Sequence, residues 1–311
     1  MIKKKLIATF LIVLATPLSA QEWPKSYQPP PSNDLILKEE IKADQYHYET
    51  KTYRIQSEIA LAPQDLTDFA TSAEAVAHAM QAIPLPLFAP PTKEKPLIQI
   101  AQNATSYETM GGSKGTAGYY HGRHQKVIIQ WEQLNRPATP KGRPSFDLLV
   151  HETSHLCMHQ WVWKMETWLI EGSAEYLAAA HLAQGRYDFK NIDNHIRNRI
   201  RQHTQTIGTK VTTLKLETLL QMNSRDWHRQ LATLNHDQVL RAYTASLLLT
   251  HYAFHGGQER RQQVKDHLTS LAQFTDYRQK PPHLFKIEDA PKIQQRLKTY
   301  WKSKGLDLTF Q

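Results

Sequence analysis

The chain predicts an α+β fold in which a small N-terminal lobe of mixed sheet and helix joins a larger helical lobe. Short stretches rich in β-branched and aromatic residues lie in the first half of the chain, at 47–55, 97–101 and 125–130. In the second half, apolar residues recur at helical spacing instead. We therefore expect one domain over residues 46–311, with the α/β lobe at 46–140 and the helical lobe at 141–311.

The first twenty residues predict an export signal. Three lysines at positions 3–5 precede an apolar run at 6–18, and a pair of small residues ends at Ala20, which is the arrangement of a signal peptide cleaved after Ala20. The apolar run is short for a transmembrane span, which disfavours the alternative of an uncleaved membrane anchor. We expect a periplasmic or secreted protein without stable membrane insertion.

Residues 21–45 contain four prolines among polar neighbours, which predicts a flexible, extended segment before the fold begins near Tyr46. In the lobe that follows, 47–55 predicts a strand and 63–83 predicts a helix. Two more strands are expected at 97–101 and 125–130, with a glycine-rich loop at 110–118 between them.

The helical lobe begins after a loop that contains Pro137, Pro140 and Pro144. Ser145 is a candidate N-cap for a first helix over 146–162. A second helix starts at Trp168, runs through three alanines at 178–180 and is expected to stop at Gly185. Further helices are expected at 191–203, 214–222, 237–255, 258–274 and 290–302.

The first of these helices carries the sequence HETSH. His151 and His155 lie four residues apart, so both imidazoles project from one helix face and can share one zinc ion. Glu152 points toward the same cleft without being a ligand, where its carboxylate can take a proton from a metal-bound water.

The second helix adds two carboxylates. Fifteen residues separate His155 from Glu171, which lies in the stretch WLIEGSAEY with Glu175 one turn further on. A turn at 164–167 lets the two helices pack together and brings Glu171 to the metal. Three protein ligands leave a fourth position for water, as in catalytic zinc sites. Glu175 is placed to accept the free ring N–H of a ligand histidine.

Together, HETSH and WLIEGSAEY resemble the HExxH and WLxEGxAEY motifs of the gluzincin metallopeptidases of the MA clan, in their thermolysin-like and aminopeptidase-like branches. The chain is most similar to the bacterial gluzincin-like group that carries the domain label DUF1570, with the strongest resemblance over residues 97–260. The resemblance implies a gluzincin-like fold with the active-site helix between the two lobes. It also implies one Zn²⁺ held by His151, His155 and Glu171, with Glu152 as general base and Glu175 as the carboxylate behind the ligands.

Two further sites follow from the resemblance. In related gluzincins a tyrosine on the helix after the third ligand faces the zinc, and Tyr243 lies in a similar stretch; a core tyrosine is the alternative. In thermolysin-like folds an edge strand pairs with an extended peptide, and residues 116–120 are the candidate, with an ordinary hairpin strand as the alternative. The chain lacks a GxMEN-type segment and its spacer is shorter than that of the large aminopeptidases, so aminopeptidase activity is not implied.

Peptide hydrolysis is the reaction that the resemblance implies, with a peptide or protein as substrate and Glu152 passing the proton of the water to the leaving amine. A non-catalytic gluzincin-fold binding protein of the cell envelope is one alternative. A basic protein that recognises anionic envelope polymers is another. A mere scaffold has no need of Glu152, which argues against both. Neither the oligomeric state nor the choice between internal and terminal cleavage follows from the sequence.

Composition supports this view. The formal charge of the whole chain is +9, and +6 remains without the three lysines of the signal peptide; this mild excess does not argue for nucleic acid. The only cysteine, Cys157, has no partner for an internal disulfide and is expected to pack in the core, with zinc ligation or redox sensing as alternatives. The basic run at 195–203 predicts a solvated helix face, or else an anion-binding patch.

Three other histidines invite the question of further ligands. His159 lies four residues after His155, but at this position it drifts away from the cleft, and we expect a structural or surface role. His251 and His255 also lie four apart, without the glutamate of an HExxH motif. We expect them to be neighbours of the metal site at most.

Overall fold

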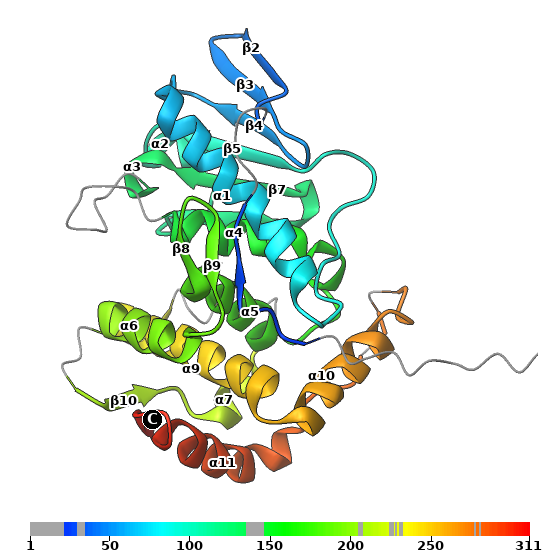
Figure 1. Cartoon of the computed structure of the whole chain (residues 1–311), viewed down its shortest axis with the longest axis vertical. Coiled ribbons are helices and arrows are strands. Elements are labelled where there is room, and N and C mark those ends of the chain that lie inside the picture. The colour runs from blue at the N-terminus through cyan, green and yellow to red at the C-terminus, as the bar shows by residue number, and fades with distance from the viewer. Residues whose placement is uncertain are drawn as a thin grey trace, which may run out of the picture.

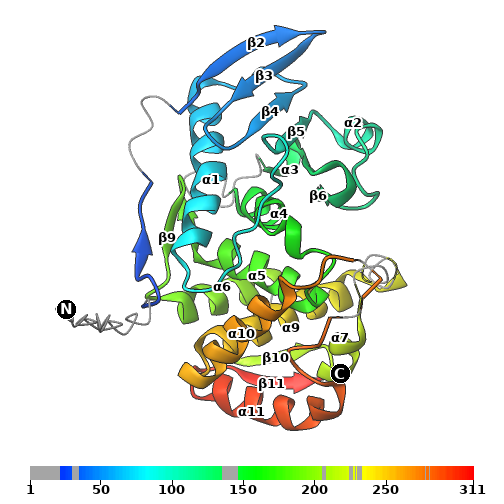
Figure 2. The ribbon, with the colours of Figure 1, turned by 90° about the vertical axis from the view of Figure 1, so that its right-hand side faces the viewer.

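The computed structural model of the chain describes residues 22–29, 35–134, 146–204, 208–223, 227, 229, 233–276, 278–279 and 281–311. Over these residues the fold combines helices with several sheets, as an α+β protein does (Figure 1). The larger sheet and helix α1 (Pro63–Ala82) form one lobe, and most of the remaining helices form the other. Helices α4 (Asp147–Cys157) and α5 (Thr167–Ala180) lie where the two lobes meet (Figure 2).

The main sheet has six strands in the order β2-β3-β4-β5-β7-β6. Pairing is antiparallel except that β5 lies parallel to β4 and to β7. Ile55, Ile98 and Val127 are adjacent across three strands and fully buried. They belong to the same hydrophobic core as the buried residues of α1 and α4. The strands are β2 (Lys38–Lys42), β3 (Gln45–Glu49), β4 (Arg54–Ser57), β5 (Leu97–Ala101), β6 (Gly118–His121) and β7 (Lys126–Gln130).

The single strand expected at 47–55 is wrong, because the chain turns between β3 and β4 and the two strands pair antiparallel. The cause is Glu74, a buried carboxylate on α1. It accepts hydrogen bonds from the Thr50 hydroxyl at 2.5 Å and from the Thr52 amide and hydroxyl at 2.6 Å. A buried carboxylate needs such donors, so the turn and the helix stabilise each other.

The fold also begins earlier than expected. Strand β2 pairs with β3, and β1 (Ser26–Tyr27) pairs antiparallel with β9 (Arg186–Asp188) in the helical lobe. The Trp23 indole donates a hydrogen bond to the Tyr176 hydroxyl at 3.0 Å. The description of 21–45 as a flexible segment ahead of the fold is therefore wrong for its described residues, which are tied to both lobes.

The helices expected in the second half of the chain are confirmed, most of them within two residues at each end. The first ends at Cys157 rather than at 162, since a 3-10 turn (His159–Trp161) follows. The second ends at Ala180, because the hairpin of β8 (His181–Ala183) and β9 follows it. The others are α6 (Ile192–Thr204), α7 (Leu216–Gln221), α9 (His236–His255), α10 (Gln258–Leu271) and α11 (Ala290–Lys302).

Gly185 does not cap a helix as expected. It lies in the β8–β9 turn with φ +70°, a conformation that favours glycine. The loop prolines and Ser145 lie outside the described residues, and Phe146 takes the N-cap position of α4. A turn at 121–124, expected before the strand at 125–130, is confirmed as a 3-10 turn (Gly122–His124). Elements that the sequence did not suggest are α2 (Ala104–Thr109), α3 (Trp131–Leu134), a 3-10 turn (Ile287–Asp289), and the parallel pair β10 (Lys210–Thr213) and β11 (Asp307–Phe310).

Helix α5 is the centre of the molecule. All of its residues are buried, and it packs against α4, α6 and α9. Gly172 permits the closest approach: a Cβ there would lie 2.3 Å from the Ser246 carbonyl oxygen and 2.1 Å from the Thr250 hydroxyl oxygen, both on α9. The residues that α5 presents to the cleft are therefore held by packing on several sides. None of the helices in the described part of the chain has the length and apolar character needed to cross a membrane.

Candidate metal centre

Three ligand atoms of suitable chemistry meet between α4 and α5. The Nε2 atoms of His151 and His155 lie 3.1 Å apart, and each lies 3.5 Å from Oε2 of Glu171. All three residues are buried. In the part of the chain that the structure describes, this is the only group of three or more such side chains that could hold a metal ion.

The separations fit a tetrahedral cation. Bonds of about 2.0–2.1 Å to zinc put neighbouring ligand atoms about 3.3–3.4 Å apart, close to the 3.1 and 3.5 Å found here. A hydrogen bond between the two rings would explain the histidine pair, but not a carboxylate oxygen equally distant from both. Two imidazoles and one carboxylate are a ligand set that zinc accepts in catalytic sites.

Glu175 lies directly behind His151, as expected. Its Oε1 is 2.8 Å from His151 Nδ1, so the ring N–H donates to the carboxylate and Nε2 is left to face Glu171. This contact fixes the orientation of the ring and its tautomer.

Arg199 on α6 completes this arrangement, and the sequence analysis missed it. Its Nε donates to Glu175 Oε2 at 2.7 Å and its Nη2 donates to Oε1 at 3.1 Å; its Nη1 lies 3.5 Å from Asp147 Oδ2. The side chain is only 11% exposed, so the basic run at 195–203 is not a uniformly solvated face. The signal was present: Arg199 lies at helical spacing from buried Ile192 and Ile196, on the apolar side of α6.

The local charges divide the carboxylates into two kinds. Burial opposes ionisation of Glu175, but Arg199 and His151 outweigh it and hold its pKa well below the usual range. Burial likewise opposes ionisation of Glu171, and the two histidines hold its pKa low. Burial raises the pKa of Glu152, against the opposing effect of the histidines. A pair of carboxyl groups whose pKa values are pushed apart is typical of groups with different roles.

The charge of His151 depends on the same carboxylates. Burial would lower the pKa of its ring, yet the hydrogen bonds to Glu171 and Glu175 raise it to about 10. The site therefore favours a positive charge at this point, whether a proton or a metal ion supplies it.

Tyr243 reaches the site from α9. Its ring lies 6.0 Å from the His151 ring and meets Trp227 edge to face at 5.6 Å. Burial, reinforced by Glu171 and Glu152, raises the pKa of Tyr243 well above its usual value. The phenol thus keeps its proton and can donate it in a hydrogen bond. The residue packs against the core and borders the cleft, so both alternatives from the sequence remain compatible with its position.

A cavity of about 1120 Å³ opens beside the metal group. The β6 strand borders it on one side and α9 on another, so both lobes contribute. Strand β6 is an edge strand of the main sheet and pairs antiparallel with β7, the next strand along the chain. Both alternatives for residues 116–120 are compatible with this position. Its apolar wall includes Leu148, Val162, Ile170, Trp227, Val239 and Leu240.

His159 is not part of the metal group. Its Nδ1 lies 2.5 Å from the Tyr120 hydroxyl, and the Tyr120 ring stacks near His155 at 6.2 Å. Cys157 is buried, with its Sγ 3.1 Å from the Tyr53 hydroxyl. Its surroundings agree with the expected packing role.

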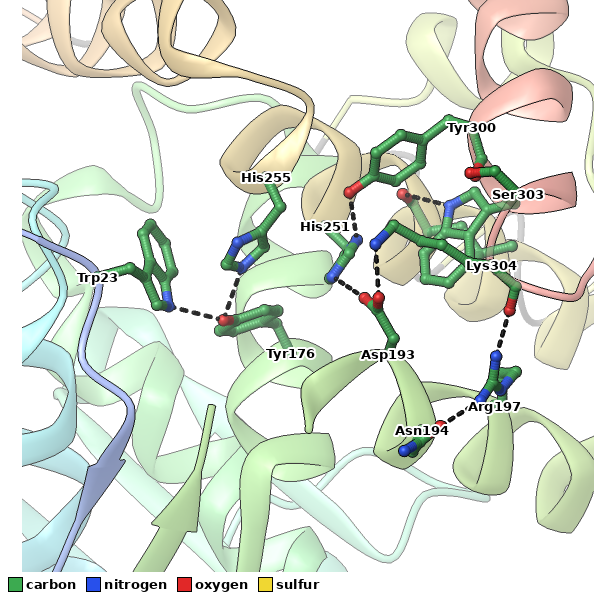
Figure 3. A network of polar contacts seen from close by, with 12 residues as sticks. Trp23, Tyr176, Asp193, Asn194, Arg197, His251, His255, Tyr300, Ser303 and Lys304 are labelled. Atoms are coloured by element: carbon green, nitrogen blue, oxygen red, sulfur yellow. Dashed lines mark hydrogen bonds and ion pairs between the residues drawn. The ribbon is translucent and has the colours of Figure 1, made fainter. Parts of the chain in front are cut away.

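His251 and His255 belong to a separate polar cluster (Figure 3), in which His251 is buried and His255 half-buried. His251 Nε2 lies 2.9 Å from Asp193 Oδ1. His255 Nε2 lies 2.9 Å from the Tyr176 hydroxyl. This cluster joins α9 to α5, α6, α11 and the segment that carries Trp23.

No family model matches the chain, and no curated protein matches it either.

Proposed function

We propose that the protein is an exported zinc metallopeptidase of the gluzincin type. The observation that carries the proposal is the meeting of His151, His155 and Glu171 at tetrahedral spacing beside a further carboxylate, Glu152, in a wide cavity. The α+β architecture with the paired helices between two lobes is compatible with a gluzincin fold. The signal-peptide pattern supports export to the periplasm or beyond.

His151, His155 and Glu171 would hold the ion, and Glu175 would orient His151. A zinc ion bound there would supply a Lewis acid for the scissile carbonyl and a water of lowered pKa. Glu152 would take the proton of the attacking water and give it to the leaving amine. Its raised pKa favours this exchange, because a base whose pKa lies nearer neutrality also serves as the acid.

Two other parts of the cavity would serve the substrate. The Tyr243 hydroxyl, which stays protonated, would donate to the oxygen that becomes negative in the transition state. The Ala117 carbonyl accepts from the Gln130 amide across the β6–β7 pair, so the backbone groups of Gly118 and Tyr120 point to the outer edge. The Tyr120 N–H already bonds Glu152, which leaves the Gly118 groups and the Tyr120 carbonyl for a substrate. An extended peptide would pair with that edge.

The test is zinc stoichiometry and a peptide-library digest, with wild type compared with Glu152→Gln. We expect one zinc per chain in both proteins and hydrolysis by wild type alone, because the amide keeps the volume of the side chain and cannot act as a base. Zinc binding without hydrolysis by wild type would point instead to a binding protein. Hydrolysis by Glu152→Gln at a near wild-type rate would contradict the mechanism.

A further inference from the structure

Strand β6 lies unusually close to Glu152, and Gly118 is the reason. An added Cβ at Gly118 would lie 2.8 Å from Glu152 Cγ and 3.0 Å from Glu152 Oε1. Both distances are shorter than ordinary carbon contacts of about 3.5–4.0 Å. It would also lie 3.0 Å from Leu148 Cδ1, one turn earlier on α4. The strand backbone therefore rests on the Glu152 side chain with no space for a methyl group between them.

Backbone conformation does not require glycine here. Gly118, the first residue of β6, is not among the residues with positive φ, and glycine weakens a strand because it has no side chain to pack. Glycines in strands often mark places where another group approaches closely. At this position the approaching group is the side chain of the proposed base.

The same strand also meets the carboxylate from a second direction. The outward-facing backbone N–H of Tyr120, two residues beyond Gly118, contributes a hydrogen bond to Glu152. A glutamate has three rotatable side-chain bonds, and a buried one is held only by its contacts. Here the backbone at Gly118 limits the movement of the Glu152 side chain by direct contact, and the Tyr120 N–H donates a hydrogen bond to its carboxylate.

We propose that Gly118 is a positioning residue for Glu152: the missing side chain lets the β6 backbone lie against the glutamate and hold its carboxylate toward His151 and His155. The catalytic consequence rests on the proposed function, but the contact itself does not. A methyl group at 118 would push the carboxylate aside or lift β6 from α4.

The test is a double-mutant cycle on the purified full chain. Gly118→Ala should lower Tm by about 2–6 °C in wild type, since an extra methyl overpacks the contact. The loss should persist in the Glu152→Gln background, where Cγ and the terminal atoms remain. It should fall to less than half in the Glu152→Ala background, where both Glu152 atoms met by the new Cβ are gone and only the contact with Leu148 remains. Gly122→Ala is the matched control, because its Cβ would be 3.7 Å from Tyr120 Cε1, an ordinary contact.

Equal Tm losses in the Glu152→Gln and Glu152→Ala backgrounds would overturn the proposal. If Gly118→Ala alone does not fold, recovery of folded protein on adding Glu152→Ala supports the contact, and failure to recover it overturns the proposal. These outcomes are read from Tm and do not depend on hydrolysis. A zinc-loaded wild type that cleaves no peptide would contradict the proposed function, but the Tm measurements would still test the contact between Gly118 and Glu152.

Kinetics separate positioning from packing. With an active wild type, Gly118→Ala should lower kcat by about 10- to 100-fold, as misplacement of a reacting group does, with KM and zinc content unchanged. Gly122→Ala should keep wild-type kcat. An unchanged kcat in Gly118→Ala, with the coupling in Tm present, would show that the contact packs the strand without positioning the base.

Discussion

At the scale of single residues, the candidate site depends on carboxylates in unequal surroundings. Arg199 and His151 keep Glu175 ionised, whereas burial raises the pKa of Glu152. This difference comes from placement, since the three glutamates on α4 and α5 are chemically alike. This difference is the basis for assigning Glu171 as a metal ligand, Glu175 as the carboxylate that orients His151, and Glu152 as the base.

Tyr243 has two possible roles that one substitution distinguishes. If its hydroxyl donates to the oxyanion, Tyr243→Phe should lower kcat by about 100-fold, in the range for one lost donor, with KM and zinc content little changed. If the residue only packs, the change should cost about 1 kcal/mol of stability through a lost hydrogen bond and leave turnover intact. Measuring kcat and Tm on the same preparation decides between them: a drop in Tm with wild-type kcat would remove Tyr243 from the catalytic residues.

At the scale of secondary-structure elements, the site requires close contact between α5 and α9. Gly172 follows Glu171 directly, and a Cβ at 172 would meet a backbone oxygen of α9 at 2.3 Å. A backbone atom cannot rotate away as the end of a side chain can, so the helices would have to separate. Movement of α5 would carry Glu171 with it.

We therefore expect Gly172→Ala to lower both Tm and zinc affinity. Overpacking of this kind costs about 1–3 kcal/mol, or several degrees in Tm. Ser173→Ala is the control, since Ser173 Oγ is buried and has no hydrogen-bond partner among the residues that the structure describes, so its removal leaves the helix spacing unchanged. Thermal melts and chelator-competition titrations measure the two effects. Wild-type zinc affinity in Gly172→Ala would show that the helix contact does not position Glu171.

The elements also show which features the sequence could predict. Helical spacing and the two motifs are local patterns of sequence. They were therefore enough to predict the main helices and to predict that His151, His155 and Glu171 face one another. The turn at 50–53 between β3 and β4 is held by Glu74, which lies on helix α1. Strand β10 pairs with β11, which lies almost a hundred residues later in the chain. Arg199 was misread because the contact with Glu175 depends on how α6 packs. Non-local partners of this kind leave little trace in a local pattern.

At the scale of the whole molecule, the N-terminal segment and four helices meet in the cluster of Figure 3. Trp23 donates to the Tyr176 hydroxyl, and Tyr176 can donate in turn to His255 Nε2. Burial, with His251 and Arg261 nearby, lowers the pKa of His255 to about 2. The histidine therefore stays neutral in the folded protein and accepts the hydrogen bond.

This gives a pH dependence of stability. Below about pH 6.5 a histidine in the unfolded chain is protonated, whereas His255 in the folded protein stays neutral. The contribution of His255 to the free energy of unfolding is therefore fully present above that pH. It falls as the pH decreases, by about 1.4 kcal/mol per pH unit. His255→Gln keeps an acceptor without titrating, and should show a shallower loss of Tm between pH 7 and pH 5 than wild type. The exposed His283→Gln is the control. Parallel Tm curves for wild type and His255→Gln would contradict this assignment.

We propose that His151, His155 and Glu171 hold the metal and that Glu175 supports them from behind. The most direct measurement is zinc affinity by chelator competition for wild type, Glu171→Ala, Glu175→Ala and the control His159→Ala, which lies outside the metal group. We predict wild-type affinity for His159→Ala, a loss of about 10- to 100-fold for Glu175→Ala, and a larger loss for Glu171→Ala. Zinc released more readily by Glu175→Ala than by Glu171→Ala would contradict the account, as would wild-type affinity in both.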